Sequence, residues 1–321
     1  MPGEQGGGPR NSAESLDDEA KAARAGVPDA QRPARRRFVS SNGLQLAVYE
    51  WGDVNAPPVL LAHGGFDFAG TFDLLAPLLA AGGWRVVAWD QRGCGSSEYA
   101  ALYSWDADMR DALAVIDTLS AEPIPIVGHS KGGALMMQLA EACPHRVSHL
   151  VNIDGLPGNK RRMADVPERE RTRMLASELA SWLEHRRSSS ASVRKPGTLD
   201  ELARRRGRLN PRLPIEWLRY LVTIGARKDD DGWRWRIDPS MRFGGFGPWR
   251  PEWSLLGVPG LGMPFLGLLG LEVEEMGWGV KPADVLPYLP PGAEFHALDT
   301  GHFVHIEQPK AVADLIIAFL S

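Results

Sequence analysis

Residues 123–142 read PIPIVGHSKGGALMMQLAEA and contain the signal that decides the fold. Residues 123–127 are a short apolar run of the kind that forms a strand buried on both faces. Residues 134–142 have the apolar spacing of a helix, so the chain must turn sharply between the two segments. The turn has the pattern Gly-x-Ser-x-Gly, with Ser130 at its centre. Because such a turn strains the backbone of the serine and exposes its hydroxyl at the edge of a sheet, the pattern predicts a catalytic nucleophile.

Further segments of both kinds alternate along the chain. Short strand-like runs occur at 38–41, 44–51, 58–62, 84–89, 147–153, 263–270 and 293–298. Helical spacing occurs at 71–81, 104–119, 169–185, 198–206, 282–289 and 309–320. Strands that alternate with helices predict an α/β protein with a mostly parallel, doubly wound sheet. In such a sheet, reactive side chains gather at the carboxyl ends of the strands.

Composition divides the chain into a tail, a core and an insertion. Residues 1–35 mix Gly, Pro, Ala and charges of both signs, which predicts a disordered tail. Residues 36–155 and 259–321 carry the alternation of strands and helices and are the predicted core. Residues 156–258 interrupt that alternation with a segment rich in Arg, Glu and Ala and then one rich in Trp and Pro. We expect this insertion to form a lid, or cap, over the serine.

The overall composition is that of a globular protein and argues against several classes. Hydrophobic residues make up 44% of the chain, and the net charge of −4 gives no electrostatic reason to expect a nucleic acid partner. The two cysteines, Cys94 and Cys143, are too few for a disulfide framework. No apolar window is long enough for a membrane span, and the first 33 residues have no signal-peptide core.

These absences lead to an expectation about partners. We predict a cytoplasmic protein that acts on a small molecule and binds neither nucleic acid nor membrane. We expect no metal and no cofactor, because no His, Cys and carboxylate cluster has ligand spacing. The sequence leaves the oligomeric state open.

A serine hydroxyl needs an adjacent base to act as a nucleophile at neutral pH. Among the eight histidines, His302 is the best placed, because it follows the last predicted strand in the run Asp-Thr-Gly-His-Phe at 299–303. It should therefore lie at the same edge of the sheet as Ser130. His305, three residues further on, is expected to be structural. We predict that His302 is the general base.

Four motifs follow one another along the chain: HGGF at 63–66, DQRGCGSS at 90–97, GHSKGG at 128–133, and GHF at 301–303 followed by EQP at 307–309. In their order and spacing they resemble the α/β-hydrolase superfamily, and in particular its capped branch with a serine nucleophile. That branch is related to epoxide hydrolases, haloalkane dehalogenases, C–C bond hydrolases and prolyl aminopeptidases. The resemblance covers 38–155 and about 262–321 and leaves out the lid. It implies an α/β-hydrolase fold.

The resemblance also implies an oxyanion hole with two backbone donors. One is the N–H of Gly65, with Phe66 as the alternative, and the other is the N–H of Lys131. Phe66 and His129 lie beside these donors in the sequence and are candidate substrate-binding residues. We expect the DQRG turn, with Asp90 and Arg92, to hold loops together rather than react.

The acid of the triad is where the chain departs from the family pattern. The family places an Asp a few residues after the Gly that ends the penultimate strand, and here that position holds Val273. Glu272 could take the role with a small shift of the loop. The alternative is Asp154, which directly follows the apolar run at 147–153. We favour Asp154 because a buried strand leads straight to it, and Glu272 remains open.

The nucleophile separates reaction classes within the family. Epoxide hydrolases and dehalogenases form an alkyl-enzyme ester on a carboxylate, whereas Ser130 implies acyl chemistry. We predict a serine hydrolase that cleaves an ester, amide or related acyl bond of a small, hydrophobic molecule. The alternatives are acyl transfer or perhydrolysis on the same triad, and a non-catalytic ligand-binding protein. The arginine-rich part of the insertion is read as a solvated face, with an anionic substrate as the alternative.

Overall fold

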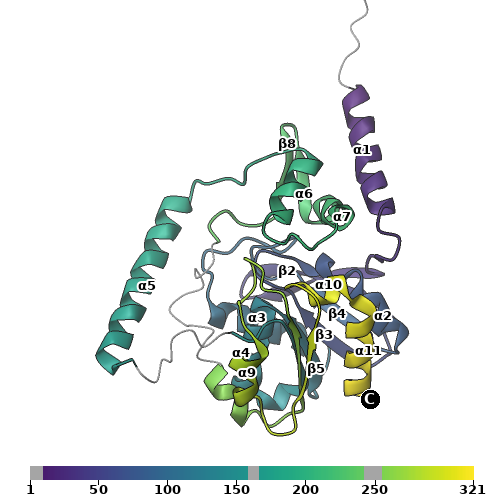
Figure 1. Ribbon diagram of the computed structural model, residues 1–321. Coiled ribbons are helices and arrows are strands. Elements are labelled where there is room, and N and C mark those ends of the chain that lie inside the picture. Colours follow the sequence, from purple (N-terminus) through teal and green to yellow (C-terminus); the bar gives the residue numbers. More distant parts are fainter. Residues whose placement is uncertain (1–9, 158–165, 242–254) are drawn as a thin grey trace, which may run out of the picture.

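The computed structural model describes residues 10–157, 166–241 and 255–321. At its centre is an eight-stranded sheet with the strand order β1-β2-β4-β3-β5-β6-β9-β10 (Figure 1). The strands are β1 (Arg35–Ser41), β2 (Leu44–Trp51), β3 (Pro58–Ala62), β4 (Arg85–Trp89), β5 (Ile124–His129), β6 (Val147–Ile153), β9 (Phe265–Gly270) and β10 (Glu294–Leu298). The strand β2 pairs antiparallel with β1 and β4, and all the other pairs are parallel. The predicted α/β class with a mostly parallel, doubly wound sheet is confirmed.

Helices cover both faces of this sheet, as Figure 1 shows. One face carries α3 (Trp105–Asp117), α4 (Lys131–Ala142) and α9 (Pro282–Val285), and the other carries α2 (Leu75–Ala81), α10 (Val304–Glu307) and α11 (Pro309–Leu320). Short 3₁₀ turns occur at Ala69–Phe72, Pro144–Arg146, Val258–Gly260 and Leu286–Tyr288. Because strand side chains alternate between faces, Leu60 of β3 packs with α3 and α4, while its neighbours Val59 and Leu61 pack with α2 and α11.

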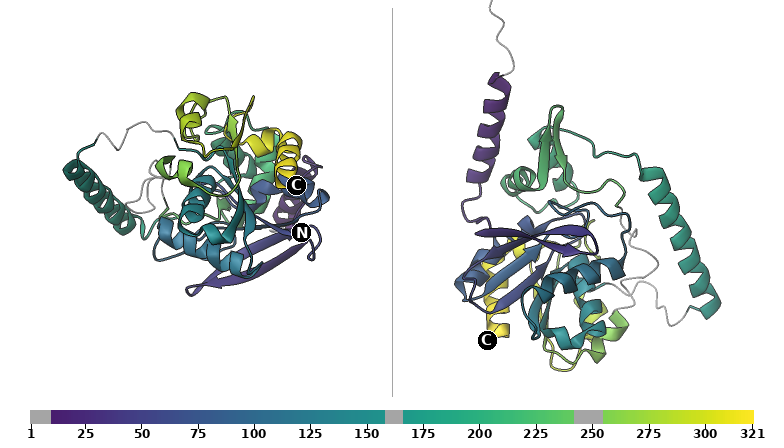
Figure 2. Two further views of the ribbon diagram at one scale, coloured as in Figure 1. Left: turned by 90° about the horizontal axis from the view of Figure 1, so that it is seen from below. Right: turned by 180° about the vertical axis from the view of Figure 1, so that it is seen from behind.

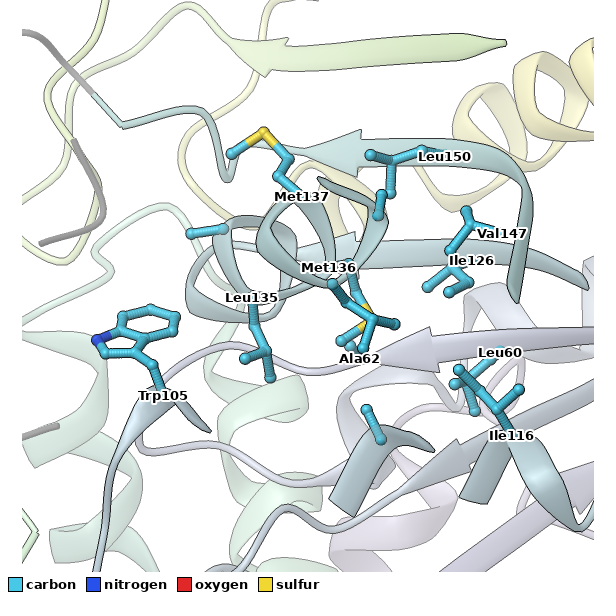
Figure 3. Packing of buried hydrophobic residues seen from close by; sticks show 14 of the residues in the cluster. Leu60, Ala62, Trp105, Ile116, Ile126, Leu135, Met136, Met137, Val147 and Leu150 are labelled. Atoms are coloured by element: carbon cyan, nitrogen blue, oxygen red, sulfur yellow. The ribbon is translucent and has the colours of Figure 1, made fainter. Parts of the chain in front are cut away.

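The core between the sheet and α4 is shown in Figure 3. Leu135 and Met136 of α4 belong to one hydrophobic cluster with Ile126 of β5, Leu60 of β3 and Ile116 of α3, and all of these side chains are fully buried. Burial of aliphatic side chains of this size contributes about 1.5–3 kcal/mol each. This packing fixes the start of α4, and with it the turn that carries Ser130.

The insertion lies between β6 and β9, which are neighbours in the sheet. It contains α5 (Glu168–Ser189), α6 (Leu199–Gly207), α7 (Ile215–Gly225), and a hairpin of β7 (Ala226–Asp229) and β8 (Gly232–Trp235). The helix α5 stands apart from the sheet in all three views (Figures 1 and 2). The other elements have a core of their own, in which Leu202, Trp217 and Trp233 pack together with Phe68 and Phe303 of the main domain. Trp217 and Trp233 therefore pack inside this insertion, which is called the lid below after its predicted role. Trp249 and Trp253 lie outside the described residues.

The prediction of a disordered tail at 1–35 is wrong from residue 10 onward. The helix α1 (Arg10–Ala25) packs against α7, and Ala20 is buried there (Figures 1 and 2). The segment after it is held by the indole N–H of Trp51, which donates to the carbonyl of Gln31 at 2.8 Å. The composition misled the prediction because, in the part of α1 whose side chains the structure describes, the residues that join the lid core are the alanines Ala20 and Ala23. A stripe of alanines among charged residues gives little hydrophobic signal.

Two further findings concern membrane-spanning helices and disulfide bonds. In the described part of the chain, no helix has both the length and the apolar character needed to cross a membrane. Cys94 and Cys143 are free thiols, and Cys94 is buried.

Candidate active site

The turn between β5 and α4 places Ser130 at the carboxyl end of the sheet. Ser130 has φ 53° and ψ −122°, and its N–H donates to the carbonyl of Ile153 at 3.0 Å. The flanking glycines are required by close approach of the backbone. A Cβ at Gly128 would lie 2.5 Å from the Gly132 oxygen, and a Cβ at Gly132 would lie 2.3 Å from the Ala62 oxygen. The predicted strained elbow is present, with the serine hydroxyl at the N-terminus of α4.

His302 and Asp154 lie next to Ser130, each at the end of its own strand. The Ser130 hydroxyl donates to Nε2 of His302 at 2.8 Å. Nδ1 of His302 donates to Oδ2 of Asp154 at 2.5 Å. The other carboxylate oxygen of Asp154 accepts from the N–H of Gly270 at 3.1 Å, which fixes the carboxylate plane. This chain of contacts has the geometry of a Ser–His–Asp triad.

The alternative acid, Glu272, does not occupy this position. Its side chain is exposed on the loop after β9, and its backbone N–H donates to the carbonyl of Thr300 at 3.0 Å. Of the two candidates from the sequence, the structure brings Asp154 to His302. The reason is the strand order, because β6 lies directly beside β5 and places its end next to Ser130.

Glu274 is a member of this site that the sequence interpretation missed. Its side chain is 9% exposed, and Oε2 accepts from the backbone N–H of His302 at 2.8 Å. A buried carboxylate therefore holds the backbone of the base, while Asp154 holds its ring. The run Leu-Glu-Val-Glu-Glu at 271–275 offers three carboxylates, and nothing in their order indicates which one is buried.

His129, a predicted substrate-binding residue, is buried behind His302. It is the last residue of β5, its side chain is fully buried, and its Nε2 lies 3.0 Å from the carbonyl oxygen of His302. Its ring centroid lies 4.8 Å from that of His302 and 4.5 Å from that of His305. Burial lowers the pKa of His129 well below its ordinary value and that of His305 to about 3. The lowered pKa values favour the neutral form of both rings, and His129 packs between those of His302 and His305.

The loop that holds the predicted oxyanion donors passes directly over the nucleophile. A Cβ at Gly64 would lie 3.2 Å from the Cβ of Ser130. Gly65 follows it, and Phe66 has a positive φ of 56°. Lys131 is the first residue of α4, where the helix dipole favours a developing negative charge. The two donor groups assigned by the resemblance therefore lie on either side of Ser130, and their roles remain predictions.

Hydrogen bonds between buried polar side chains hold these loops in place. His63 donates from Nδ1 to the Gly64 oxygen at 2.7 Å and accepts from the N–H of Gln91 at 2.9 Å, and burial lowers its pKa to about 3. The ammonium of Lys131 donates to Gln91 and to Asp108, both at 2.6 Å.

The DQRG turn has the expected supporting role. Arg92 donates to both carboxylate oxygens of Asp111, at 2.6 and 2.7 Å. Asp90 accepts from the backbone N–H of Ala69 and of Ser96, at 2.8 and 2.7 Å.

A lid side chain also reaches the oxyanion loop. Arg206 of α6 donates to the carbonyl of Phe66 at 3.2 Å and to Oδ2 of Asp67 at 3.1 Å. Both side chains of this ion pair are largely buried, at 10% and 2% exposure, and burial raises the pKa of Asp67 to about 6. This contact could not be predicted from the sequence, because Arg206 stands in the run Arg-Arg-Arg-Gly-Arg at 204–208, which is typical of a solvent-exposed face.

Comparison with known proteins agrees with this geometry. A family model described as "Alpha/beta hydrolase family" matches residues 59–315. The chain belongs to this family. The expected superfamily is therefore confirmed, whereas the particular capped branch stays a prediction.

Individual relatives of this α/β hydrolase match over shorter stretches. A serine hydrolase-like protein of Dictyostelium discoideum is 34% identical over 117 residues, which is 35% of this chain and 32% of the relative. Epoxide hydrolase A of Mycobacterium tuberculosis is 38% identical over 103 residues, which is 31% of this chain and 32% of the relative. The matches thus span about a third of the length of these curated relatives.

A solved structure shows the same fold over almost its whole length. The thioesterase domain from the curacin biosynthetic pathway superposes with a TM-score of 0.75 at 24% identity, covering 88% of this chain and 99% of that domain.

Proposed function

We propose that this α/β hydrolase is a serine hydrolase that cleaves an ester, amide or related acyl bond of a small molecule through an acyl-enzyme on Ser130. The observation that carries the proposal is the continuous contact from the Ser130 hydroxyl through His302 to Asp154. Such a relay activates a hydroxyl that is otherwise a weak nucleophile at neutral pH. The relative named a serine hydrolase-like protein supports the same chemistry.

The geometry suggests a role for each group. Nε2 of His302 takes the proton of Ser130 as Oγ attacks the carbonyl carbon, and Asp154 stabilises the imidazolium that forms. The backbone N–H groups of Lys131 and of Gly65, or of Phe66 in its place, stabilise the oxyanion, with about 3 kcal/mol typical for one donor. His302 then gives its proton to the leaving group, and the acyl group stays on Ser130.

Deacylation repeats these steps with water as the nucleophile. His302 takes a proton from the water as it attacks the acyl carbon, and returns that proton to Oγ of Ser130 when the acid leaves. Acyl transfer and perhydrolysis would share the acyl-enzyme and differ only in the acceptor.

The nucleophile argues against an epoxide hydrolase, despite the relative of that name. Opening an epoxide through an alkyl-enzyme ester needs a carboxylate that is regenerated by hydrolysis. The elbow of this chain holds Ser130, and Asp154 is engaged by His302 and Gly270. We therefore assign the chain to acyl chemistry.

The test is hydrolysis of p-nitrophenyl esters of rising acyl-chain length. We expect the wild-type protein to release p-nitrophenol, and Ser130→Ala and His302→Ala each to lower kcat by about 10³-fold or more. Circular dichroism should show that both variants are folded. Wild-type turnover by Ser130→Ala would contradict the proposal, and no turnover by any folded form would favour a non-catalytic ligand-binding protein.

A further inference from the structure

A cavity lies in the lid, outside the candidate triad. It has a volume of about 350 Å³ and is formed by the end of α5, the segment that follows it, the β7–β8 hairpin and the loop after β8. Four of the described residues that line it are arginines: Arg186, Arg194, Arg227 and Arg234. The one carboxylate among those lining residues belongs to Asp238.

Two of the arginines are neutralised by carboxylates outside the cavity. Arg227 donates to Asp229 at 3.1 Å. Arg234 donates to Asp229 at 2.7 Å and to Asp231 at 2.5 Å. These two guanidinium groups therefore contribute little net charge to the cavity.

Arg186 and Arg194 contact neutral acceptors instead. Arg194 donates to the carbonyl of Ile237 at 3.0 Å and to the carbonyl of Asp238 at 2.7 Å. Arg186 donates to the carbonyl of Ala101 at 2.6 Å and to the hydroxyl of Ser240. Within residues 10–157, 166–241 and 255–321, neither guanidinium forms an ion pair with a carboxylate. A guanidinium has more N–H donors than these contacts use, so both groups retain donors for a ligand.

The carboxylate of Asp238 anchors the loop after β8, which both arginines contact. Its Oδ2 accepts from the hydroxyl of Tyr103 at 2.5 Å, and its Oδ1 accepts from the N–H and the hydroxyl of Ser240, both at 2.8 Å. Its own N–H donates to the carbonyl of Gly93 at 2.8 Å. The loop is thus tied to the main domain, and one carboxylate faces two guanidinium groups. Burial lowers the pKa of Arg194, as expected for an incompletely compensated charge.

Two residues that line the cavity lie close to aromatic side chains of the loop that carries the predicted oxyanion donors. Cζ of Arg194 lies 5.9 Å from the centroid of the Phe66 ring. Trp235, which also lines the cavity, has its ring centroid 6.4 Å from that of Phe68, two residues further along the same loop. A group bound at Arg194 therefore lies beside the loop that carries the predicted oxyanion donors.

We propose that Arg186 and Arg194 form a subsite for an anionic group, a carboxylate or a phosphate, carried by the substrate. This inference rests on the proposed acyl hydrolase function and narrows its substrate class. A bound anion would compensate the positive charge of the two guanidinium groups. It would also accept paired N–H hydrogen bonds from each of them, which is the geometry in which arginine binds carboxylates and phosphates. It revises the expectation of a purely hydrophobic substrate.

The test compares two p-nitrophenyl esters of equal acyl length, one ending in a methyl group and one in a carboxylate. We expect wild-type kcat/KM to be about tenfold or more higher for the anionic ester, and Arg186→Gln and Arg194→Gln each to lower that ratio about tenfold. Arg187→Gln is the control. Arg187 is the next residue of α5 after Arg186, its side chain is exposed, and it forms an ion pair with Glu184 at 2.7 Å. It should leave the ratio at the wild-type value.

The outcomes of these measurements distinguish a failure of the anionic subsite from a failure of the proposed hydrolase function. Turnover of both esters with a wild-type ratio near one, or an unchanged ratio in both variants, would overturn the subsite and leave the hydrolase intact. If neither ester is turned over, calorimetric titration with glutarate still tests the subsite. Binding of glutarate by the wild-type protein that is lost in Arg194→Gln would support the subsite. No binding by the wild-type protein would overturn it. Binding of inorganic phosphate together with equal turnover of both esters would assign the cavity to a free anion and contradict a substrate-borne group.

Discussion

Phe66, Ser130 and Asp154 have positive φ angles of 56°, 53° and 45°, in a region that residues with side chains rarely occupy. All three lie at the candidate active site. The other such residue in the described chain, Asn42, lies in the turn of the β1–β2 hairpin. Strained residues of this kind cost on the order of 1–3 kcal/mol each, so they persist only where the surrounding packing enforces them. Their concentration at one site supports a functional role for it.

The assignment of Asp154 as the acid leads to a prediction at the residue scale. Asp154→Asn preserves size but removes the charge that holds Nδ1–H of His302. We expect kcat for a p-nitrophenyl ester to fall about 10⁴-fold, with the protein still folded. Glu272→Gln, on the exposed loop, is the matched control and should retain wild-type kcat. Steady-state kinetics decide the matter, and the reverse pattern would show that Glu272 is the acid.

The sequence predicts Ser130 and His302 from local patterns and favours Asp154 as the acid, but it leaves Glu272 open. Ser130 stands in a local pattern whose strand, turn and helix are all visible in the chain, and His302 follows a visible strand. The choice between Asp154 and Glu272 depends on which strand end faces the imidazole, which is a property of strand order. Glu274 was missed for the same reason, because its contact with the His302 backbone depends on the path of one loop.

At the scale of elements, the lid helix α6 is joined to the loop after β3. Arg206 holds the carbonyl of Phe66 and the carboxylate of Asp67, and its Cζ lies 5.3 Å from the centroid of the Phe303 ring. The backbone direction of the predicted oxyanion donors is therefore set in part by the lid. We regard Arg206 as a positioning residue that acts through this loop.

This role predicts a split between kcat and KM. In Arg206→Gln the loop loses its anchor, so we expect kcat to fall about tenfold with a smaller change in KM, because oxyanion contacts act mainly in the transition state. Arg206→Lys should restore part of kcat. The neighbouring Arg205 contacts Pro196 and Glu201 within the lid, so Arg205→Gln should leave both constants unchanged. An effect confined to KM, or equal effects of both glutamine variants, would contradict the role.

Elements of the sheet were more predictable than those of the lid. The strands of the core are apolar runs whose type follows from length and flanking turns. The helices α1 and α7 were not predicted. In the part of α1 whose side chains the structure describes, the residues that join the lid core are alanines. The helix α7 lies in a stretch rich in Trp and Pro, although residues 215–225 have helical apolar spacing.

At the scale of the whole molecule, a single buried carboxylate joins three parts of the chain. Asp73 of the main domain accepts from Arg32 of the N-terminal segment at 2.7 Å and from the hydroxyl of Tyr220 in the lid. Partners this far apart in the sequence are not visible in any local pattern, which is why the lid contacts could not be foreseen.

Three buried neutral histidines, His63, His129 and His305, couple the stability of the fold to pH. Because their folded-state pKa values are lowered, their contribution is fully present above the unfolded value of about 6.5 and is lost as pH falls toward the folded value. For His305, whose folded pKa is about 3, the loss extends from about pH 6.5 down to about pH 3.

Replacement of His305 isolates its share of this effect. His305→Leu should make the free energy of unfolding depend less steeply on pH below 6.5, by about 1.4 kcal/mol per pH unit. Burial raises the pKa of Asp67 and of Asp73 to about 6, which has the opposite sign but is common to both proteins and cancels in the difference. Urea unfolding at a series of pH values measures both slopes, and equal slopes would contradict a neutral buried His305.

The proposed function requires Ser130 to be an activated nucleophile. Reaction with a fluorophosphonate probe, followed by peptide mass spectrometry to locate the label, measures this activation directly. We expect a label on Ser130 that is absent in Ser130→Ala and forms much more slowly in His302→Ala. Folded wild-type protein that takes up no label, or a label on another residue, would contradict it.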